Sequence, residues 1–200
     1  MRNSAPRGLS NMAIGSQPVL QPERRQEDRS IRTFRPACIE AEGKAYLATM
    51  KDISEYGCGF EGAIPLTPGQ PVRYRWSSRA FVTATVVWVD GMRFGLMNDA
   101  PCDIGANAGF PYRSVRIPFE HSASVFVCGR RIDAAALNIA QKGLCIALDE
   151  PIPAGCLCTI EVCGAIFPNA TIRWLKGDSA GFALEKPMSL RALAFLTNPE

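Results

Sequence analysis

Residues 51–60, KDISEYGCGF, place Asp52, Ser54 and Gly57 at fixed intervals in a chain of 200 residues. The segments on either side, AYLATMKDI and CGFEG, carry apolar, β-branched and aromatic residues with partial alternation, and this pattern predicts two strands. Asp and Ser side chains readily bond local backbone, and Gly tolerates sharp bends, so the residues between are expected to turn. The spacing alone leaves open whether Asp52 and Ser54 also belong to a ligand site.

Further short strands are predicted on both sides of this turn. Their sequences are ACIEA, PVRYRW, FVTATVVWV and RFGLMN, separated by breaks such as AEGK, TPGQ and VDGM. Closely spaced short strands of this kind predict a small antiparallel barrel or sandwich, so the fold class is mainly β.

The second half of the chain repeats the first. ATVVW, ending at Trp88, recurs as ATIRW, ending at Trp174, and the same offset of 86 relates Gly57 to Gly143 and Asp52 to Asn138. RSIR at 29–32 recurs as RSVR at 113–116. We therefore expect two copies of one strand-rich domain. The predicted boundaries are a disordered tail at 1–22, a first domain at 23–98, a linker at 99–110 and a second domain at 111–200.

The end of the second copy differs from the first. MSLRALAFL, residues 188–196, predicts a short amphipathic helix with Ser189 as its N-cap. The first copy has no comparable segment before the linker, which leaves open how the first barrel is closed off.

Comparing the copies separates two roles within 51–60. Gly57 persists as Gly143, which indicates a backbone requirement of the fold such as positive φ. Asp52 and Ser54 become Asn138 and Ala140, so the shared fold does not require them.

The first copy also holds a pair of arginines that the second lacks. Arg25 and Arg29 form R-x-x-x-R, whereas the second copy has Gly109 and Arg113 at the matching places. The first 36 residues hold seven arginines and three acids, a net charge of +4, which favours an anionic partner or a flexible basic arm.

R-x-x-x-R followed, 23 residues after Arg29, by D-x-S-x-x-G resembles the PilZ domain, the bacterial receptor module for cyclic di-GMP. The resemblance covers about 23–98 with both motifs complete, and a degenerate copy would cover about 111–197. It implies a six-stranded antiparallel β-barrel for each copy, with a short helix after the second. It also implies that Arg25 and Arg29 grip phosphate and guanine, and that Asp52 and Ser54 orient a guanine. Gly57 would allow close approach, and Arg24 would be a further phosphate contact.

The chemistry of these residues agrees with such a ligand. An arginine fork matches both guanine O6/N7 and phosphate oxygens, and its plane can stack on a purine. A carboxylate such as that of Asp52 accepts hydrogen bonds from guanine N–H groups.

The remaining residues exclude several classes of function. No apolar stretch resembles a signal peptide or reaches the length of a transmembrane helix, which favours a cytoplasmic protein without membrane insertion. The eight cysteines include no C-x-x-C pair, so a metal site is not predicted, and most of them are expected to be small buried hydrophobes. His121 has no partner for acid–base chemistry, so we expect neither an enzyme nor a cofactor.

Trp88 and Trp174 are expected to be core or barrel-packing residues rather than stacking platforms, because both copies keep them. Binding of a nucleic-acid polymer is not predicted, because no aromatic stripe follows the basic segment. The sequence thus predicts a cyclic di-GMP receptor that passes a conformational change to its second domain or to a protein partner. A protein–protein adaptor that keeps the fold without binding the nucleotide is the alternative.

Overall fold

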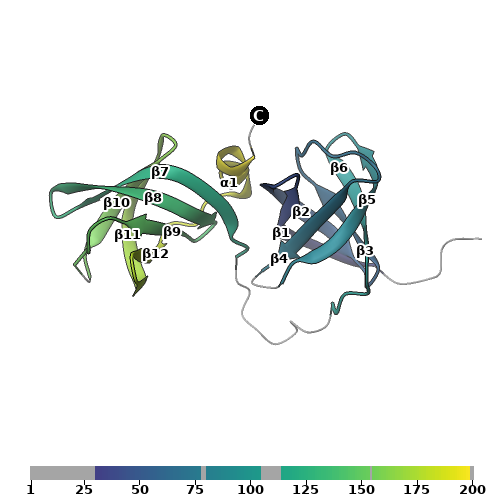
Figure 1. Cartoon of the computed structure of the whole chain (residues 1–200), viewed down its shortest axis with the longest axis horizontal. Coiled ribbons are helices and arrows are strands. Elements are labelled where there is room, and N and C mark those ends of the chain that lie inside the picture. Colours follow the sequence, from purple (N-terminus) through teal and green to yellow (C-terminus); the bar gives the residue numbers. More distant parts are fainter. Residues whose placement is uncertain (1–29, 78–79, 105–113, 154, 199–200) are drawn as a thin grey trace, which may run out of the picture.

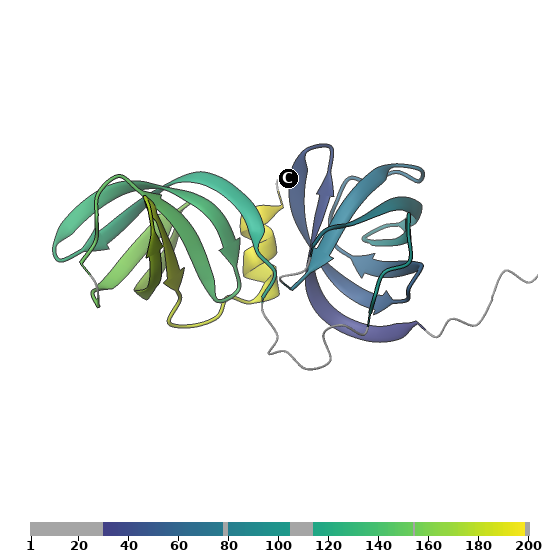
Figure 2. The same cartoon turned by 60° about the horizontal axis from the view of Figure 1, so that its bottom comes forward.

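The computed structural model describes residues 30–77, 80–104, 114–153 and 155–198. Two β-barrels lie side by side, and the helix α1 stands between them (Figures 1 and 2). The strands of the first barrel are β1 Ile31–Ala41, β2 Lys44–Ile53, β3 Gly57–Glu61, β4 Pro71–Trp76, β5 Val82–Asp90 and β6 Arg93–Asn98. They close in the order β1-β2-β3-β6-β5-β4, and every neighbouring pair is antiparallel.

The second barrel has the same strand order. Its strands are β7 Ile117–Val127, β8 Arg130–Ala140, β9 Gly143–Leu148, β10 Leu157–Val162, β11 Ala165–Lys176 and β12 Ser179–Ala183. They close as β7-β8-β9-β12-β11-β10. The predicted fold, two six-stranded antiparallel barrels with a short C-terminal helix, is therefore confirmed.

The offset of 86 predicted from the sequence holds for the backbone. β7 begins and ends 86 positions after β1, and β8, β9, β10 and β12 each begin 86 positions after their counterparts. The β-bulge between Met50 and Asp52 recurs between Ala136 and Asn138. Both barrels also turn between their first two strands through a residue pair with positive φ, which is Glu42–Gly43 in the first and Cys128–Gly129 in the second.

The interior of the first barrel is aromatic. Phe60 contacts the rings of Tyr74 and Phe94 at centroid distances of 5.4 Å, and all three are buried. The second barrel is filled mainly by aliphatic side chains such as Ile146 and Ile160. Each barrel thus has its own apolar interior, which is the usual condition for an independently folded domain.

The helix α1, Leu190–Thr197, begins as the sequence predicts, because the Ser189 hydroxyl accepts a hydrogen bond from Ala192 N at 3.1 Å. Its end contacts the first barrel. Asn198 Oδ1 accepts from Leu47 N at 2.7 Å, and Asn198 Nδ2 donates to Leu47 O at 3.0 Å. β3 pairs with β2 only from Thr49 onward, so the Asn198 amide takes the place of a neighbouring strand at Leu47.

The apolar face of α1 also joins the two barrels. Cys38 and Leu47 belong to the apolar cluster that contains Leu193 of α1, while their neighbours Ala37 and Ala48 belong to the interior of the first barrel. β1 and β2 are therefore buried on both faces at this point, as strands are where a helix covers a sheet. The first copy needs no helix of its own, because the helix of the second copy covers it.

The structure also tests the predictions made for the cysteines and His121. Cys38, Cys58, Cys145 and Cys158 are buried, but Cys102 and Cys156 are half-buried and Cys128 and Cys163 are exposed, so half of the cysteines are not the buried hydrophobes expected. His121 lies at the surface against the ring of Phe119. Within the described ranges, no helix has the length and apolarity needed to cross a bilayer.

Candidate functional site

The turn 54–57 is closed by hydrogen bonds within the D-x-S-x-x-G segment. Ser54 N donates to Gly57 O at 2.8 Å, and the Ser54 hydroxyl donates to the same oxygen at 3.2 Å. The hydroxyl proton is thus used within the turn, and the lone pairs of Ser54 Oγ are what this conformation offers to a ligand N–H group.

A buried asparagine anchors this turn to the barrel interior. Asn98 Nδ2 donates to Glu55 O at 2.8 Å, Asn98 N donates to Tyr56 O at 2.9 Å, and Asn98 Oδ1 accepts from the Tyr74 hydroxyl at 2.9 Å. Burial raises the pKa of Tyr74, so its hydroxyl stays protonated and remains a donor. Residues 160 and 184, which correspond to Tyr74 and Asn98 in the second copy, are Ile and Leu. This anchor belongs to the first copy alone, as Asp52 and Ser54 do.

Asp52 lies against the backbone of β3, beside the β-bulge that follows Met50. Its Oδ1 accepts from Gly59 N at 3.0 Å, and a Cβ on Gly59 would lie 2.7 Å from Asp52 Oδ2. The absence of a side chain at Gly59 therefore makes room for the carboxylate. The second copy has Cys145 at this position and Asn138 in place of Asp52.

Gly57 is required for a different reason from the one expected. It is not among the residues with positive φ; instead, a Cβ on Gly57 would lie 2.5 Å from Leu96 O. Gly143 has the same constraint, with Phe182 O at 2.3 Å. The requirement is the close approach of neighbouring strands, so the prediction of a structural glycine is right and the proposed positive φ is wrong.

The sequence predicts Trp88 and Trp174 in the core or packed on the barrel; a core position is wrong, whereas packing on the barrel is observed. Their side chains lie on the outer surface, 46% and 37% exposed, and each indole covers a glycine of the adjacent strand. A Cβ on Gly95 would lie 2.1 Å from Trp88 Nε1, and the same distance separates a Cβ on Gly181 from Trp174 Nε1. A β-bulge precedes each tryptophan and turns it outward.

Asp52, Ser54, Gly57 and Trp88 line one pocket of about 310 Å³ on the first barrel. Its cations are Lys51 and Arg93. Lys51 Nζ lies 2.8 Å from Glu61 Oε2, and this ion pair holds the pKa of Glu61 below its ordinary value. The pocket combines a carboxylate, a hydroxyl, an exposed indole and two cations. Groups of these kinds can bind the base and the phosphates of a nucleotide.

Arg24, Arg25 and Arg29 lie outside the described residues. The described part of the chain begins beside the pocket, because Ile31 pairs with Ile53 and Arg32 pairs with Asp52 across β1 and β2. Strand register also corrects the alignment of the copies. β1 begins at Ile31 and β7 at Ile117, an offset of 86. The same offset places Pro111 and Val115 opposite Arg25 and Arg29, in place of Gly109 and Arg113. The second copy lacks the paired arginines under either alignment.

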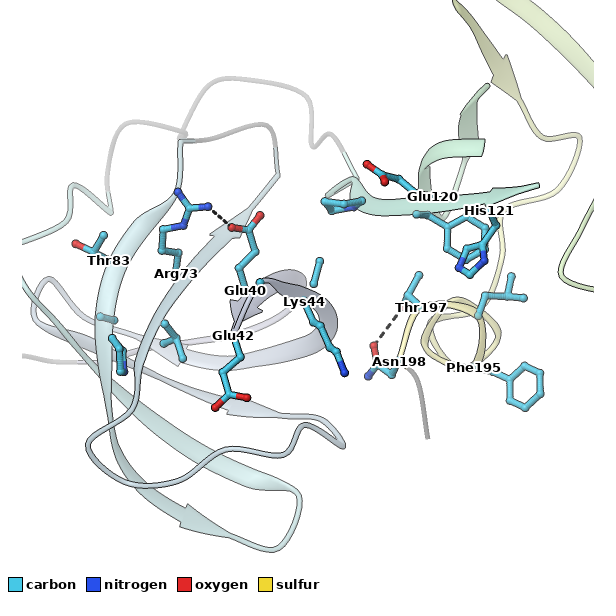
Figure 3. A pocket seen from close by; sticks show the side chains of 18 of the residues that line it. Glu40, Glu42, Lys44, Arg73, Thr83, Glu120, His121, Phe195, Thr197 and Asn198 are labelled. Atoms are coloured by element: carbon cyan, nitrogen blue, oxygen red, sulfur yellow. Dashed lines mark hydrogen bonds and ion pairs between the residues drawn. The ribbon is translucent and has the colours of Figure 1, made fainter. Parts of the chain in front are cut away.

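A larger pocket of about 1080 Å³ lies between the barrels and contains none of the predicted residues (Figure 3). Glu40, which is paired with Arg73, and Glu42 approach it from the first barrel. Thr197 of α1 and the C-cap Asn198 approach it from the second domain. Its described lining has four carboxylates and two cations, Lys44 and Arg73. This charge disfavours a phosphorylated ligand.

A comparison with known protein families matched residues 23–101 to the PilZ domain. The matched segment, residues 23–101, is a PilZ domain. The match spans the first barrel and both motifs of its candidate site, and the second barrel repeats the strand order of the PilZ domain.

Three of the solved structures that are similar to the chain match it over most of its length. PlzA of Borreliella burgdorferi in complex with c-di-GMP is 8% identical, with 86% of this chain and 93% of that chain covered and a TM-score of 0.35. The motility inhibitor MotI/DgrA of Bacillus subtilis is 12% identical over 82% and 95% of the chains, with a TM-score of 0.36. YcgR of Escherichia coli in complex with c-di-GMP is 12% identical over 75% of each chain, with a TM-score of 0.32. A search of curated proteins found no match.

Sequence reasoning missed three residues of the PilZ domain that shape its pocket. The recurrence of Trp88 as Trp174 favours a packing role, although a residue that repeats can also be exposed in both copies. Gly59 and Asn98 differ between the copies, because the second copy has Cys145 and Leu184 at these positions. This difference indicates that the shared fold does not require them. Extending the comparison of copies beyond the two motifs would have found both.

Proposed function

We propose that the first barrel is a receptor for cyclic di-GMP, without catalytic activity of its own. In this proposal Arg25 and Arg29 bind phosphate and guanine, and Asp52 and Ser54 orient a guanine. Gly57, which lines the same pocket, allows the close strand approach that shapes it. Arg24 adds a phosphate contact.

The observation that carries the proposal is the strand register at the end of β2. Because Ile31 pairs with Ile53, the chain enters β1 beside Asp52 and Ser54. Arg29 is two residues before Ile31, so chain connectivity keeps its Cα within about 7 Å of the Ile31 Cα. This register supports the proposal that the two motifs act at one pocket, although Asp52 follows Arg29 by 23 positions in the sequence.

Trp88 extends this proposal. Its exposed indole lies in the same pocket as Asp52, and a guanine held by that carboxylate could stack on the ring. Arg93 and Lys51 supply positive charge for the second phosphodiester group.

The proposed output is a change in how the barrels pack. β2 carries Asp52 near one end and Leu47 near its centre, and Leu47 is bound by Asn198 of the second domain. A ligand that pulls the arginine segment against the end of β2 would alter this contact, or the surface offered to a protein partner. In this view the second barrel transmits the signal.

Titration calorimetry with cyclic di-GMP tests the assignment. Wild type is expected to bind, and Arg25→Ala, Arg29→Ala and Asp52→Ala are each expected to weaken binding by about tenfold or more, because each removes a charged hydrogen-bonding group. Undiminished binding by all three variants would contradict the assigned residues. No heat with wild type would favour the adaptor.

A further inference from the structure

The second barrel has a pocket at the place where the first barrel has its candidate site. Asn138, Gly143 and Trp174 line it, 86 positions after Asp52, Gly57 and Trp88. Its volume is about 830 Å³, against about 310 Å³ in the first barrel. This size lies within the range of small-molecule sites, which is roughly 300–1,000 Å³. The pocket of the second barrel is therefore larger than that of the first, although the second barrel lacks the D-x-S motif.

The charge of this pocket differs from that of its counterpart. Four cations line it, and no described lining residue carries a carboxylate; the cations are Arg75, Arg116, Lys142 and Arg173. We call these residues, together with Trp174, the cationic pocket. None of the four cations takes part in the ion pairs found among the described residues. Like charges gathered around one pocket repel each other, and a bound anion would relieve this repulsion.

Three of these cations are specific to the second copy. The first copy has Ser30, Tyr56 and Val87 at the positions that correspond to Arg116, Lys142 and Arg173. The one acid of the first pocket, Asp52, has become Asn138. The two pockets thus share a backbone frame, two glycines and a tryptophan, but the second has cations where the first has neutral side chains.

The fourth cation comes from the other domain. Arg75 lies on β4 of the first barrel, its Nη2 donates to Arg116 O at 2.8 Å, and its guanidinium lies 4.5 Å from the centroid of the Phe81 ring. The Arg75 side chain is therefore held at the junction by contacts from both sides. An anion in the cationic pocket would touch the two barrels at once.

The indole of Trp174 gives the pocket an aromatic surface. It lies over Gly181, where a Cβ would stand 2.1 Å from Trp174 Nε1, and it remains 37% exposed. A planar base can stack on such a ring, and Arg173 lines the same pocket.

We propose that the cationic pocket is a second ligand site, specific for a nucleotide that carries at least two phosphate charges. Arg116, Lys142 and Arg173 bind the phosphates, Trp174 stacks on the base, and Arg75 makes the site depend on the packing of the two barrels. This proposal does not rest on the function proposed for the first barrel. The nucleotide is either a cyclic dinucleotide or a free nucleoside polyphosphate.

The test uses the full chain with Asp52→Ala, so that the first site contributes as little as possible. Cyclic di-GMP, GTP and pyrophosphate are titrated separately by calorimetry. We expect one of the two nucleotides to bind, and the tighter one identifies the source. Pyrophosphate is expected to bind more weakly because it has no base to stack on Trp174. Failure of both nucleotides to bind, or equal affinity for pyrophosphate, would overturn the proposal.

A pair of variants then locates the binding. Arg116→Ser/Arg173→Val carries the residues of the first barrel at two exposed positions, so the fold should tolerate it. It is expected to weaken nucleotide binding about 100-fold, because two charged contacts are lost. Arg130→Ser/Arg131→Ser removes the same charge from the β7–β8 end of the barrel, where these arginines pair with Glu150 and Asp133. It is expected to leave the affinity unchanged, and an equal loss in both variants would contradict the assigned pocket.

Discussion

At the scale of single residues, Gly59 determines where the Asp52 carboxylate can lie. The carboxylate occupies the space that a side chain at 59 would fill, and it accepts a hydrogen bond from the Gly59 amide. The second copy shows that the barrel itself accepts a larger residue here, because Cys145 occupies the same place in β9. Position 59 therefore bears on the site more than on the fold.

This contrast gives a prediction for Gly59→Ala. The added methyl should push the Asp52 carboxylate away from its hydrogen bond and lower the affinity for cyclic di-GMP about tenfold, or about 1.4 kcal/mol. The melting temperature should fall by less than about 4 °C, since the displaced group is the mobile end of a side chain. Calorimetric titration and a thermal melt of the same sample measure both. A large loss of stability with unchanged affinity would reverse the assignment.

Asn98 and Tyr74 provide a second residue-scale prediction. Asn98→Leu introduces the residue of the second copy but leaves the buried Tyr74 hydroxyl without its acceptor, which should cost about 1–3 kcal/mol in the free energy of unfolding. Tyr74→Phe in the same chain should recover part of this loss, because both polar partners are then gone. Denaturant unfolding of the two single variants and the double variant measures the coupling. Additive losses would mean that the hydrogen bond contributes nothing.

At the scale of elements, α1 belongs to the second domain in sequence and serves both domains in space. The amide of its C-cap, Asn198, completes the hydrogen bonding of β2 at Leu47, and Leu193 shares one apolar cluster with Cys38 and Leu47 of the first barrel. The helix thus explains why the first barrel has no helix after β6.

Asn198→Ala should loosen this contact. The buried Leu47 N–H and C=O groups would lose their partner, at a cost of about 1–3 kcal/mol, and the Leu47 amide should exchange its hydrogen faster. Hydrogen exchange at Leu47 and differential scanning calorimetry measure the two effects. Phe195→Ala, on the same helix with the side chain 83% exposed, is the control and should change neither. Unaltered exchange in Asn198→Ala would contradict the contact.

Most of the elements could be predicted from the sequence, because strand periodicity, turn residues and the N-cap are local signals. The repeat added the offset between the copies. The position of Trp88 could not be predicted, since a β-bulge after Val86 turns the ring outward and bulges leave little trace in a sequence. The contact between the end of α1 and β2 could not be predicted either, because it joins Leu47 to Asn198 across 151 positions. For the candidate site, Asp52 and Ser54 could be proposed from the motif, whereas Gly59 and Asn98 act through three-dimensional contacts.

At the scale of the whole molecule, the two barrels have the same strand order but different side chains at equivalent positions. Gln70 Nε2 donates to Glu42 Oε1 at 3.2 Å in the first barrel and so joins the β1–β2 turn to the segment before β4. At the corresponding positions of the second barrel, Cys128 and Cys156 have their sulfur atoms 3.5 Å apart. The same two segments are thus linked by an amide in one copy and by a thiol pair in the other.

Oxidative cross-linking tests this equivalence. A mild disulfide-forming oxidant should join Cys128 to Cys156, and the reaction should quicken as the pH rises, because the contact with Cys128 raises the pKa of the Cys156 thiol and only the thiolate reacts. Glu42→Cys/Gln70→Cys should form the matching bond in the first barrel. Peptide mass spectrometry without reduction identifies both bonds. A preference of Cys128 for the exposed Cys163 would contradict the observed geometry.

The central claim is that cyclic di-GMP binds the first barrel at the pocket of Asp52, Ser54 and Trp88. Chemical-shift mapping by NMR on the full chain tests it most directly, because the Trp88 indole N–H and the amides of 52–59 report on the pocket itself. Addition of cyclic di-GMP should shift these signals strongly in wild type, and the shifts should vanish in Asp52→Asn/Ser54→Ala, which carries the residues of the second copy. Strong ligand-induced shifts that leave Trp88 and 52–59 unmoved, or that persist unchanged in the variant, would contradict the claim.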